Sequence, residues 1–480
     1  MASDLHFVLF PLMQQGHMIP MIDIARILAH HHQATVTIIT TPVNANRFRP
    51  TIDRAIKAKL KIQVVELQLP LAEVGLPEGC ENFDTIPSFD LFVKLYAAMD
   101  MLEKPAENVL QGLNPPPSCI ISDNQFPWTT DLARKFNIPR LVFHGPGCFT
   151  YLCLHIVMHT NILNEIESDE DYFVVPGIKD RIEVTKAQAN GWGKVETKEM
   201  VEFFSRMKVA EEGADGIVVN SFQELELNYV EELAKAKDKK VWCIGPVSQH
   251  NTSFLDLSER GNKAGINEHD CIKWLDKKEA GSVIFVCLGS MANISTEQIF
   301  ELGLGLELSK VSFIWCVRNT TEESDKWLLE YKERVKERGL VVRGWAPQVL
   351  ILSHKAVGGF VTHCGWNSTL EGVSAGVPMV TYPCFADQFF NERFIIDVLK
   401  IGVSVREYDN TGVLVKKENI KRAVESIMDT EGEGKVRRNR AKEFGDMAKR
   451  AMEEGGSSHL NMTLMIQDII EQLAKFTKPN

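Results

Sequence analysis

Short apolar segments rich in β-branched residues recur along this 480-residue chain, and amphipathic stretches lie between most of them. The apolar segments are almost uniformly hydrophobic, which is typical of strands buried on both faces of a parallel sheet. Between the first two, Ile22, Ala25 and Leu28 form one apolar stripe at helical spacing. The predicted strands span residues 5–11, 34–41, 61–69, 118–123, 140–145 and 216–222 in the first half, and 282–290, 312–318, 340–345, 358–364 and 379–383 in the second.

A polar stretch rich in Gly, Asn and Ser separates the two sets of strands, and it is interpreted as a linker because it lacks apolar periodicity. The chain is also longer than one ordinary domain, which has about 100–200 residues. We therefore predict an α/β fold with two doubly wound, Rossmann-like parallel-sheet domains. The predicted divisions are a first domain at 1–246, the linker at 247–268, a second domain at 269–457 and a last helix at 458–480, which the sequence allows to pack back on the first domain.

Charge and cysteine content exclude several kinds of partner and compartment. The net charge is −11, from 53 Lys and Arg against 64 Asp and Glu, and no basic block that would neutralise phosphates stands out. Nucleic acid is therefore not an expected partner. The ten cysteines are scattered and form no CxxC pair, which indicates buried thiols in a reducing compartment.

The first residues show no sign of a secretory signal. The apolar run at 5–13 follows Asp4 rather than a basic region, and Gln14 cuts it short. No uninterrupted apolar stretch of about 18 residues follows, so no membrane span is expected. We expect a cytoplasmic protein, with a monomer as the default state.

The segment 345–388 places polar side chains where a predicted strand meets a helix. The strand ends at His363 and the helix begins after Gly365, so backbone N–H groups face an anion at a positive helix end. His363 can donate a hydrogen bond to a phosphate oxygen. Trp345 offers a flat face to a base, and Glu371 can accept from ribose hydroxyls. The pattern predicts a nucleotide diphosphate site, with Asp387 and Gln388 placed after the next strand for sugar hydroxyls.

This 44-residue segment resembles, without a gap, the signature box of the plant secondary-product UDP-glycosyltransferases. The resemblance covers essentially the whole chain, including the ISD and PW of 121–128, VPG at 175–177 and CLGS at 287–290. The family is inverting and has the GT-B fold, in which two Rossmann-like domains face a cleft. Ligands of such sheets bind beyond the carboxyl strand ends. We therefore expect the site in an interdomain cleft, with a UDP-sugar as co-substrate and no cofactor.

The resemblance also implies a role for each polar residue of the box. Gln388 resembles the glucose-using members, whereas His at this place is associated with galactose, so UDP-glucose is the expected donor. The implied ligands are Trp345, Ala346 and Gln348 for uracil, Glu371 for ribose, Ser290, His363, Gly365, Asn367 and Ser368 for the diphosphate, and Trp366, Asp387 and Gln388 for the sugar.

A histidine and an aspartate follow two predicted strands of the first domain. His17 is expected in a loop just past the first strand, and Asp123 ends the strand at 118–123. A carboxylate beside an imidazole fixes its tautomer and stabilises the imidazolium, which suits a general base. We predict that His17 takes the acceptor proton and that Asp123 supports its charge, as the resemblance also implies. A helix cap or surface position is the alternative for each residue taken alone.

The acceptor is the least constrained part of the prediction. Loops of the first half at 71–90, 124–126, 145–155 and 180–205 are expected to shape its pocket. Resemblance within the family favours flavonoids, other phenolics, triterpenes or steroids. The side chains proposed to line the pocket are Phe126, His144, Phe149 and Phe203, although phenylalanine is more often a core residue.

No metal is expected from the sequence. His30, His31 and His32 lack the spacing of ligands and are interpreted as a solvated helix end. The sequence 169–171 resembles the DxD motif of metal-dependent transferases, but it lies in a polar, acidic stretch that is predicted to be a loop.

Three other functions compete with this interpretation. Residues 145–150 nearly form the GxGxxG of a nicotinamide dehydrogenase, but Thr150 replaces the third glycine. A binder of nucleotide-sugars without catalysis is a second alternative, which the presence of both His17 and Asp123 disfavours. A membrane-anchored lumenal transferase is the third, disfavoured by the missing signal and span.

Overall fold

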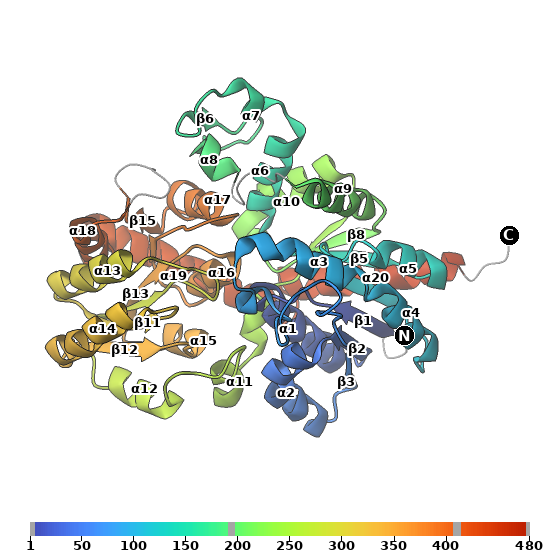
Figure 1. The fold of residues 1–480 in the computed structure, drawn as a ribbon, viewed down its shortest axis with the longest axis horizontal. Coiled ribbons are helices and arrows are strands. Elements are labelled where there is room, and N and C mark those ends of the chain that lie inside the picture. The colour runs from blue at the N-terminus through green and yellow to red at the C-terminus, as the bar shows by residue number, and fades with distance from the viewer. Residues whose placement is uncertain (1–4, 191–196, 407–413, 477–480) are drawn as a thin grey trace. The chain divides into compact units, whose positions relative to one another are not determined.

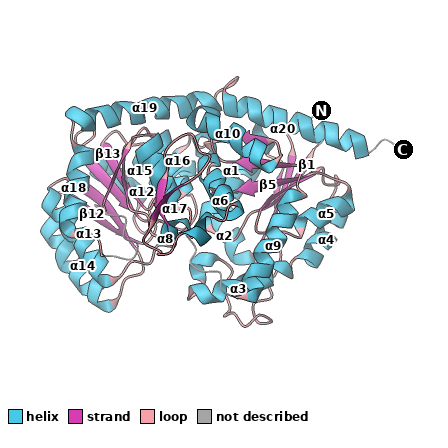
Figure 2. Cartoon of the chain, turned by 90° about the horizontal axis from the view of Figure 1, so that it is seen from above, coloured by secondary structure: helices cyan, strands magenta, loops and turns pink. Residues whose placement is uncertain are grey.

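The computed structural model describes residues 5–190, 197–406 and 414–476, and the chain divides into two compact units. Unit 1 comprises Met1–Cys148, Val195–Thr252 and Arg450–Asn480, and unit 2 comprises Phe149–Lys194 and Ser253–Lys449. Figure 1 labels the elements, and Figure 2 shows strands in magenta among helices in cyan. Each unit contains its own parallel sheet, which confirms the predicted α/β class with two doubly wound domains.

Unit 1 is built on a seven-stranded sheet with the order β3-β2-β1-β4-β5-β8-β9. Every pairing is parallel. Strands β1, β4, β5 and β8 are buried along their whole length, as their uniform apolar sequences predict. The strands are β1 (His6–Phe10), β2 (Thr35–Thr40), β3 (Ile62–Glu66), β4 (Cys119–Asp123), β5 (Arg140–His144), β8 (Gly216–Val219) and β9 (Val241–Cys243).

Helices α1, α2 and α20 share one hydrophobic core with this sheet. From α20, Met465 and Ile469 are fully buried in that core, and Asn461 donates a hydrogen bond to the backbone oxygen of Cys243 in β9. The last helix thus belongs to unit 1. The helices of unit 1 are α1 (Gln15–His31), α2 (Pro42–Lys57), α3 (Phe92–Asp100), α4 (Glu103–Gly112), α5 (Thr129–Phe136), α9 (Lys198–Glu212), α10 (Gln223–Lys237) and α20 (Ser457–Phe476), with short turns η2 (Phe83–Thr85), η3 (Phe89–Leu91) and η4 (Val247–His250).

Unit 2 is built on a six-stranded parallel sheet with the order β12-β11-β10-β13-β14-β15. A separate antiparallel pair, β6 (Tyr172–Val174) and β7 (Glu183–Thr185), belongs to the same unit. The strands of the sheet are β10 (Val283–Cys287), β11 (Ser312–Val317), β12 (Gly339–Arg343), β13 (Val357–Thr362), β14 (Met379–Thr381) and β15 (Gly402–Ser404).

Three of the longer unit 2 helices, α12, α13 and α14, begin at a side-chain cap. Asn267, Ser295 and Thr321 each accept a backbone N–H in the first turn of the helix that follows. The helices of unit 2 are α6 (Cys148–His159, whose first residue is in unit 1), α7 (Ile162–Glu165), α8 (Lys186–Ala189), α11 (Phe254–Ser258), α12 (Glu268–Leu275), α13 (Thr296–Ser309), α14 (Glu322–Val335), α15 (Gln348–Leu352), α16 (Trp366–Ser374), α17 (Gln388–Arg393), the π-helical η5 (Phe394–Val398), α18 (Lys417–Met428) and α19 (Gly432–Met452, whose last residues are in unit 1).

The units differ from the sequence-based divisions in two places. Residues 149–194 group with unit 2, because Phe149 stacks on Phe394 with ring centroids 4.9 Å apart and the Thr150 hydroxyl donates to Asn391 at 2.6 Å. The predicted linker is divided between the units and contains η4 and α11, so it is not irregular throughout.

Among the described residues, no helix combines the length and the apolar character needed to cross a membrane.

Candidate active site

The first part of the site lies at the carboxyl end of the unit 1 sheet. Strands β1 and β4 are direct neighbours, with Phe10 paired to Ser122. The chain leaves β1 into α1, which begins at Gln15, so His17 lies in the first helical turn rather than in the expected loop. Asp123 is the last residue of β4. The two strand ends therefore bring this histidine and this carboxylate together, as the sequence pattern indicates.

The two side chains form a short hydrogen bond in which His17 Nδ1 lies 2.5 Å from Asp123 Oδ2. The carboxylate is fully buried, and the imidazole is 16% exposed. Asp123 Oδ1 also accepts the backbone N–H of Gln125 at 3.1 Å. A carboxylate held in this way favours the tautomer with the proton on Nδ1, which makes Nε2 the basic nitrogen.

Gly145 provides the space for the imidazole. A Cβ at this position would lie 2.5 Å from Cε1 and 2.7 Å from Nε2 of His17, closer than any real contact allows. The glycine follows β5, the neighbour of β4 in the sheet. The Gly-Pro-Gly sequence that raised the dehydrogenase alternative thus has a different role here, since it lets the His17 ring approach the backbone.

A further polar layer supports Asp123 and was not predicted. The Tyr96 hydroxyl donates to Gln125 Oε1 at 2.7 Å, and Gln125 is the residue whose backbone bonds Asp123. Burial, with a smaller contribution from Asp123, raises the pKa of Tyr96, so the phenol stays neutral. Arg140, fully buried, donates to the backbone oxygen of Asp123 at 3.4 Å. Tyr96 comes from α3, and no local sequence pattern links it to the strand ends.

The second part of the site lies at the carboxyl end of the unit 2 sheet, where each of five successive strands is followed by a left-handed residue. Three of these, Asn319, Cys364 and Ala386, have a Cβ and adopt a conformation that costs about 1–2 kcal/mol outside glycine. Such strain is concentrated at binding and catalytic sites. The residues and their φ angles are Gly289 at 78°, Asn319 at 49°, Gly344 at 87°, Cys364 at 64° and Ala386 at 57°.

His363 is packed between two of the turns. A Cβ on either Gly289 or Gly365 would lie 2.4 Å from its Nε2, so both residues must be glycine for this ring to fit. Burial lowers the pKa of His363 to about 4, which keeps the imidazole neutral near pH 7. Its Nδ1 is buried and has no hydrogen-bond partner in the described part of the chain. Gly365 is the N-cap of α16, so a polar ring nitrogen and backbone N–H groups occur in the same turn.

The residues predicted for uracil and ribose form a connected group. Gln348 Nε2 donates to Glu371 Oε2 at 2.8 Å and to Ser368 Oγ at 3.0 Å. Arg260, from the predicted linker, forms an ion pair with Glu371 at 3.7 Å. Trp345 lies two residues past the end of β12 instead of ending it, and it bridges to Ala264 of the same predicted linker. Sequence reasoning missed both linker contacts.

The residues predicted for the sugar are tied to the same turns through Asn391. Asn391 Nδ2 donates to Asp387 Oδ2 and to the backbone oxygen of Cys364, each at 2.8 Å. Gln388 Oε1 accepts the backbone N–H of Cys384 at 2.8 Å and of Phe385 at 3.2 Å. Since the oxygen is held by the backbone, Gln388 would meet a sugar hydroxyl with its amide N–H group.

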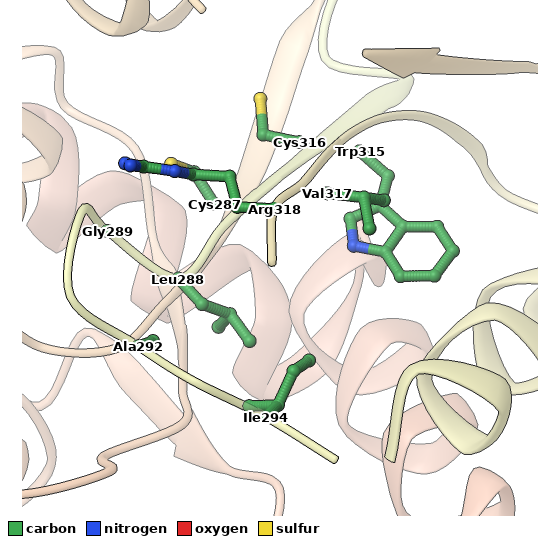
Figure 3. Close-up of a pocket in the computed structure, with 9 residues that line it drawn as sticks. All are labelled: Cys287, Leu288, Gly289, Ala292, Ile294, Trp315, Cys316, Val317 and Arg318. Carbon is green, nitrogen blue, oxygen red and sulfur yellow. The ribbon is translucent and has the colours of Figure 1, made fainter. Parts of the chain in front are cut away.

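A pocket opens at the ends of β10 and β11, as Figure 3 shows. Its walls include Leu288, Ile294 and Trp315, and Arg318 contributes the cationic group. The Arg318 guanidinium carbon lies 5.9 Å from the ring centroid of Trp345, where it can interact with the π system. A flat ring, apolar walls and a cation at one sheet edge suit a nucleotide base and its phosphates.

The remaining donor candidates lie in the same turns. Ser290 follows Gly289 and is half-buried, Asn367 and Trp366 begin α16, and Ala346 is a buried neighbour of Trp345. All twelve predicted donor residues thus belong to unit 2.

The acceptor candidates are less favourable, because all four side chains are at most 3% exposed. Phe149 stacks on Phe394 inside unit 2, and Phe203 stacks on Tyr96 with ring centroids 4.2 Å apart. Phe126 packs with Phe10 and Trp128. These contacts favour the core alternative for the phenylalanines.

His144 is likewise a buried residue, with Nε2 3.6 Å from Glu211 Oε2. Residues 191–196 of the proposed loop 180–205 lie outside the described residues. The acidic sequence 169–171 is exposed in the segment between α7 and β6, away from the strands of the sheet.

Comparisons with known proteins identify relatives that match nearly the whole chain. The family model described as "UDP-glucoronosyl and UDP-glucosyl transferase" matches residues 267–433. UDP-glycosyltransferase 73E1 of Stevia rebaudiana is 57% identical over 98% of this chain and 97% of its own length. UDP-glycosyltransferase 73C3 of Arabidopsis thaliana is 50% identical with the same coverage.

Two solved structures share the fold over nearly the full chain. Glycyrrhiza uralensis UGT73P12, complexed with glycyrrhetinic acid 3-O-monoglucuronide, has a TM-score of 0.89 and 34% identity and covers 98% of this chain and 96% of its own. Phytolacca americana UGT2, complexed with UDP-2fluoro-glucose and pterostilbene, has a TM-score of 0.77 and 25% identity and covers 97% and 100%. The likeness confirms the GT-B fold class and disfavours the oxidoreductase and binder alternatives. With 57% identity over almost its whole length, the chain belongs to the plant UDP-glycosyltransferase family.

Proposed function

We propose that this protein is an inverting glucosyltransferase that moves glucose from UDP-glucose to a hydroxyl of a small lipophilic acceptor. The hydrogen bond of 2.5 Å between His17 and Asp123 carries the proposal, because a binder without catalysis needs no buried carboxylate behind an imidazole. The polar turns of unit 2 supply the groups that a UDP-sugar requires.

The proposed reaction is a single displacement. Nε2 of His17 takes the proton of the acceptor hydroxyl while its oxygen attacks the anomeric carbon. The bond from that carbon to the diphosphate oxygen breaks, and UDP leaves with the electron pair, so the configuration inverts. The proton remains on the imidazole, where Asp123 stabilises the positive charge. Aligned proton transfer of this kind contributes about 10²–10⁴ to the rate.

The departing diphosphate is stabilised by unit 2. The N-terminal turn of α16 provides backbone N–H groups, and neutral His363 provides a ring N–H. Both groups are held in place before the reaction, since His363 is fixed between Gly289 and Gly365. We propose that no metal or other cofactor takes part, so a chelator should leave turnover unchanged.

Glucose is favoured as the sugar by the two side chains proposed to hold it. Asp387 is a carboxylate and Gln388 presents an amide N–H, which suits neutral sugar hydroxyls. A glucuronosyl donor is the second candidate, because UGT73P12 is complexed with a glucuronide. Asp387 would repel the carboxylate of that sugar. A panel of UDP-glucose, UDP-galactose and UDP-glucuronic acid distinguishes these donors.

The acceptor class is proposed to be phenolic, triterpenoid or steroidal. UGT2 is complexed with pterostilbene and UGT73P12 with glycyrrhetinic acid 3-O-monoglucuronide, which supports flat or polycyclic apolar acceptors. All ten cysteines are free thiols, which supports a reducing compartment, and we propose the cytoplasm. A monomer remains the proposed state.

The test compares His17→Ala and Asp123→Ala with the wild type. Product formation from UDP-glucose and an aglycone panel is followed by mass spectrometry, and UDP binding by calorimetry. We expect His17→Ala to abolish transfer with UDP affinity intact, and Asp123→Ala to lose less because the imidazole remains. His269→Ala on α12 serves as the control. Turnover retained by His17→Ala would remove this residue from the mechanism.

A further inference from the structure

Three histidines gather at the carboxyl end of α1, outside the candidate active site. His30 and His31 are the last two residues of α1, and His250 is the last residue of η4. One ligand nitrogen from each ring lies within 4.8 Å of the other two. The ring centroids are 4.6 Å apart for His30 and His31, 5.5 Å for His30 and His250, and 5.2 Å for His31 and His250.

A buried polar contact fixes η4 against α1. Asn251, which follows His250, donates from Nδ2 to Asp23 Oδ1 at 2.9 Å and accepts a hydrogen bond from Arg26 Nη1. All three side chains are buried, and Asp23 and Arg26 belong to α1. The backbone positions of the three histidines are therefore set by packed elements and not by a loose loop, which favours a preformed site.

The chemistry of the group suits a transition metal. Neutral imidazole nitrogen is a preferred ligand of zinc, copper and nickel. Zinc binds nitrogen at about 2.0–2.1 Å, so two ligand nitrogens of a tetrahedral site lie about 3.4 Å apart. The present nitrogen spacing of up to 4.8 Å is wider than this, so metal binding requires rotation of the exposed His30 and His31 side chains. The negative end of the α1 dipole also favours a cation here.

We propose that His30, His31 and His250 form a surface site for a divalent transition metal of the zinc, nickel and copper class. The sequence run 30–32 does not by itself have the spacing of metal ligands, and the third ligand, His250, comes from a segment distant in the sequence. His459 of α20 also interacts with His31, but the nitrogen distances select His250 as the third ligand. The ion has no part in the proposed transfer reaction.

Another pair of histidines can also bind metal and must be separated from this site. His155 and His159 are four residues apart on α6, with ring centroids 4.0 Å apart. Two histidines four residues apart on one helix lie on the same helix face, so both imidazoles can coordinate one metal ion. A double variant, His155→Gln with His159→Gln, removes this contribution and serves as the matched control.

The test uses the full chain without an affinity tag, after treatment with a chelator. Zn²⁺ binding is measured by calorimetry, and Co²⁺ binding by visible absorption. We expect one saturable site that survives the His155→Gln/His159→Gln change. His250→Gln should weaken binding by about tenfold or more, the scale of losing a group that supports a metal site. Exposed His30→Gln should do the same, which separates ligand loss from misfolding.

Three results would overturn the proposal. They are the absence of Zn²⁺ binding by the wild type, unchanged binding in both His250→Gln and His30→Gln, and loss of the site in the double variant on α6. Transferase activity measured with and without saturating Zn²⁺ should be the same for the His30→Gln protein.

Discussion

At the scale of single residues, the positions of the candidate acid–base residues were predictable from the sequence, whereas the residues that support them were not. The sequence pattern predicts that His17 and Asp123 follow the ends of two strands, and in the structure His17 Nδ1 lies 2.5 Å from Asp123 Oδ2. Gly145 contributes only the absence of a side chain, which leaves no chemical signal in the sequence. Tyr96 and Asn391 act through tertiary contacts with Gln125 and Asp387, and only the folded chain shows these.

Gly145 offers a test of how closely the His17 ring must be positioned. In Gly145→Ala, the new Cβ would meet the imidazole at 2.5 Å and displace it from Asp123. We expect kcat to fall by about 10²-fold, the cost of misplacing a catalytic group by about 1 Å. UDP affinity should not change, because the donor groups lie in unit 2.

Gly112→Ala is the control for this variant, because an added Cβ at the end of α4 meets nothing within 4 Å. It should keep wild-type kcat. If Gly145→Ala also kept wild-type kcat, the contact with the His17 ring would have no catalytic importance.

Buried histidines should make the fold sensitive to mild acid. Burial lowers the pKa of His144 from 6.5 to about 4, although Glu211 opposes the shift. The unfolded chain therefore binds a proton here below about pH 6.5, whereas the folded chain does not until about pH 4. Burying neutral His144 therefore lowers the free energy of unfolding progressively as the pH falls from 6.5 towards 4, and has no such effect above pH 6.5.

The variant His144→Gln should therefore show a smaller loss of stability between pH 6.5 and 4.5 than the wild type. Urea unfolding midpoints at a series of pH values measure this difference. The exposed His159→Gln serves as the comparison and should follow the wild-type curve. Parallel pH curves for His144→Gln and the wild type would show that His144 does not titrate differently on unfolding.

At the scale of elements, uniform apolar runs predicted eleven strands that the structure contains. The missed strands, β9, β15 and the pair β6 and β7, have three residues each, too few to display a pattern. The predicted strand ends at 345 and 364 were too long by two residues. Gly344 and Cys364 turn the chain there with positive φ, and a cysteine gives no turn signal.

The segment predicted as a linker contributes Arg260 to the proposed donor site. Its guanidinium lies 3.7 Å from the Glu371 carboxylate, beside Gln348. We expect Arg260→Ala to raise the KM for UDP-glucose about fivefold, since a net hydrogen-bond or ion-pair contribution is about 1 kcal/mol. The kcat should change little, because Glu371 is proposed to bind ribose equally before and during the reaction.

Arg334→Ala is a suitable control, because Arg334 forms a partly exposed pair with Glu307. Steady-state kinetics at saturating acceptor provide both constants. A KM equal to the wild-type value in Arg260→Ala would show that this arginine does not position Glu371.

At the scale of the whole molecule, the resemblance of the signature box gave the family and fold, whereas the boundaries of the units depend on tertiary contacts. The chain passes between the units four times, near residues 148, 194, 252 and 449. Residues 149–194 lie in sequence between two strands of the first set, β5 and β8, yet the contacts of α8 and β7 with α17 group them with unit 2. The acceptor pocket was not predictable, because the same apolar residue types occur in pocket-lining loops and in the hydrophobic core, and the sequence does not distinguish the two.

The central claim is the proposed mechanism, in which the base comes from unit 1 and the donor-binding groups come from unit 2. The most direct test is the rate of transfer by wild type and His17→Ala to a series of phenols with decreasing pKa. If His17 removes the acceptor proton, the wild type should exceed the variant by the largest factor for weakly acidic hydroxyls. That factor should shrink towards unity as the phenol ionises by itself. A factor that stays constant across the series would contradict the assignment of His17 as the general base.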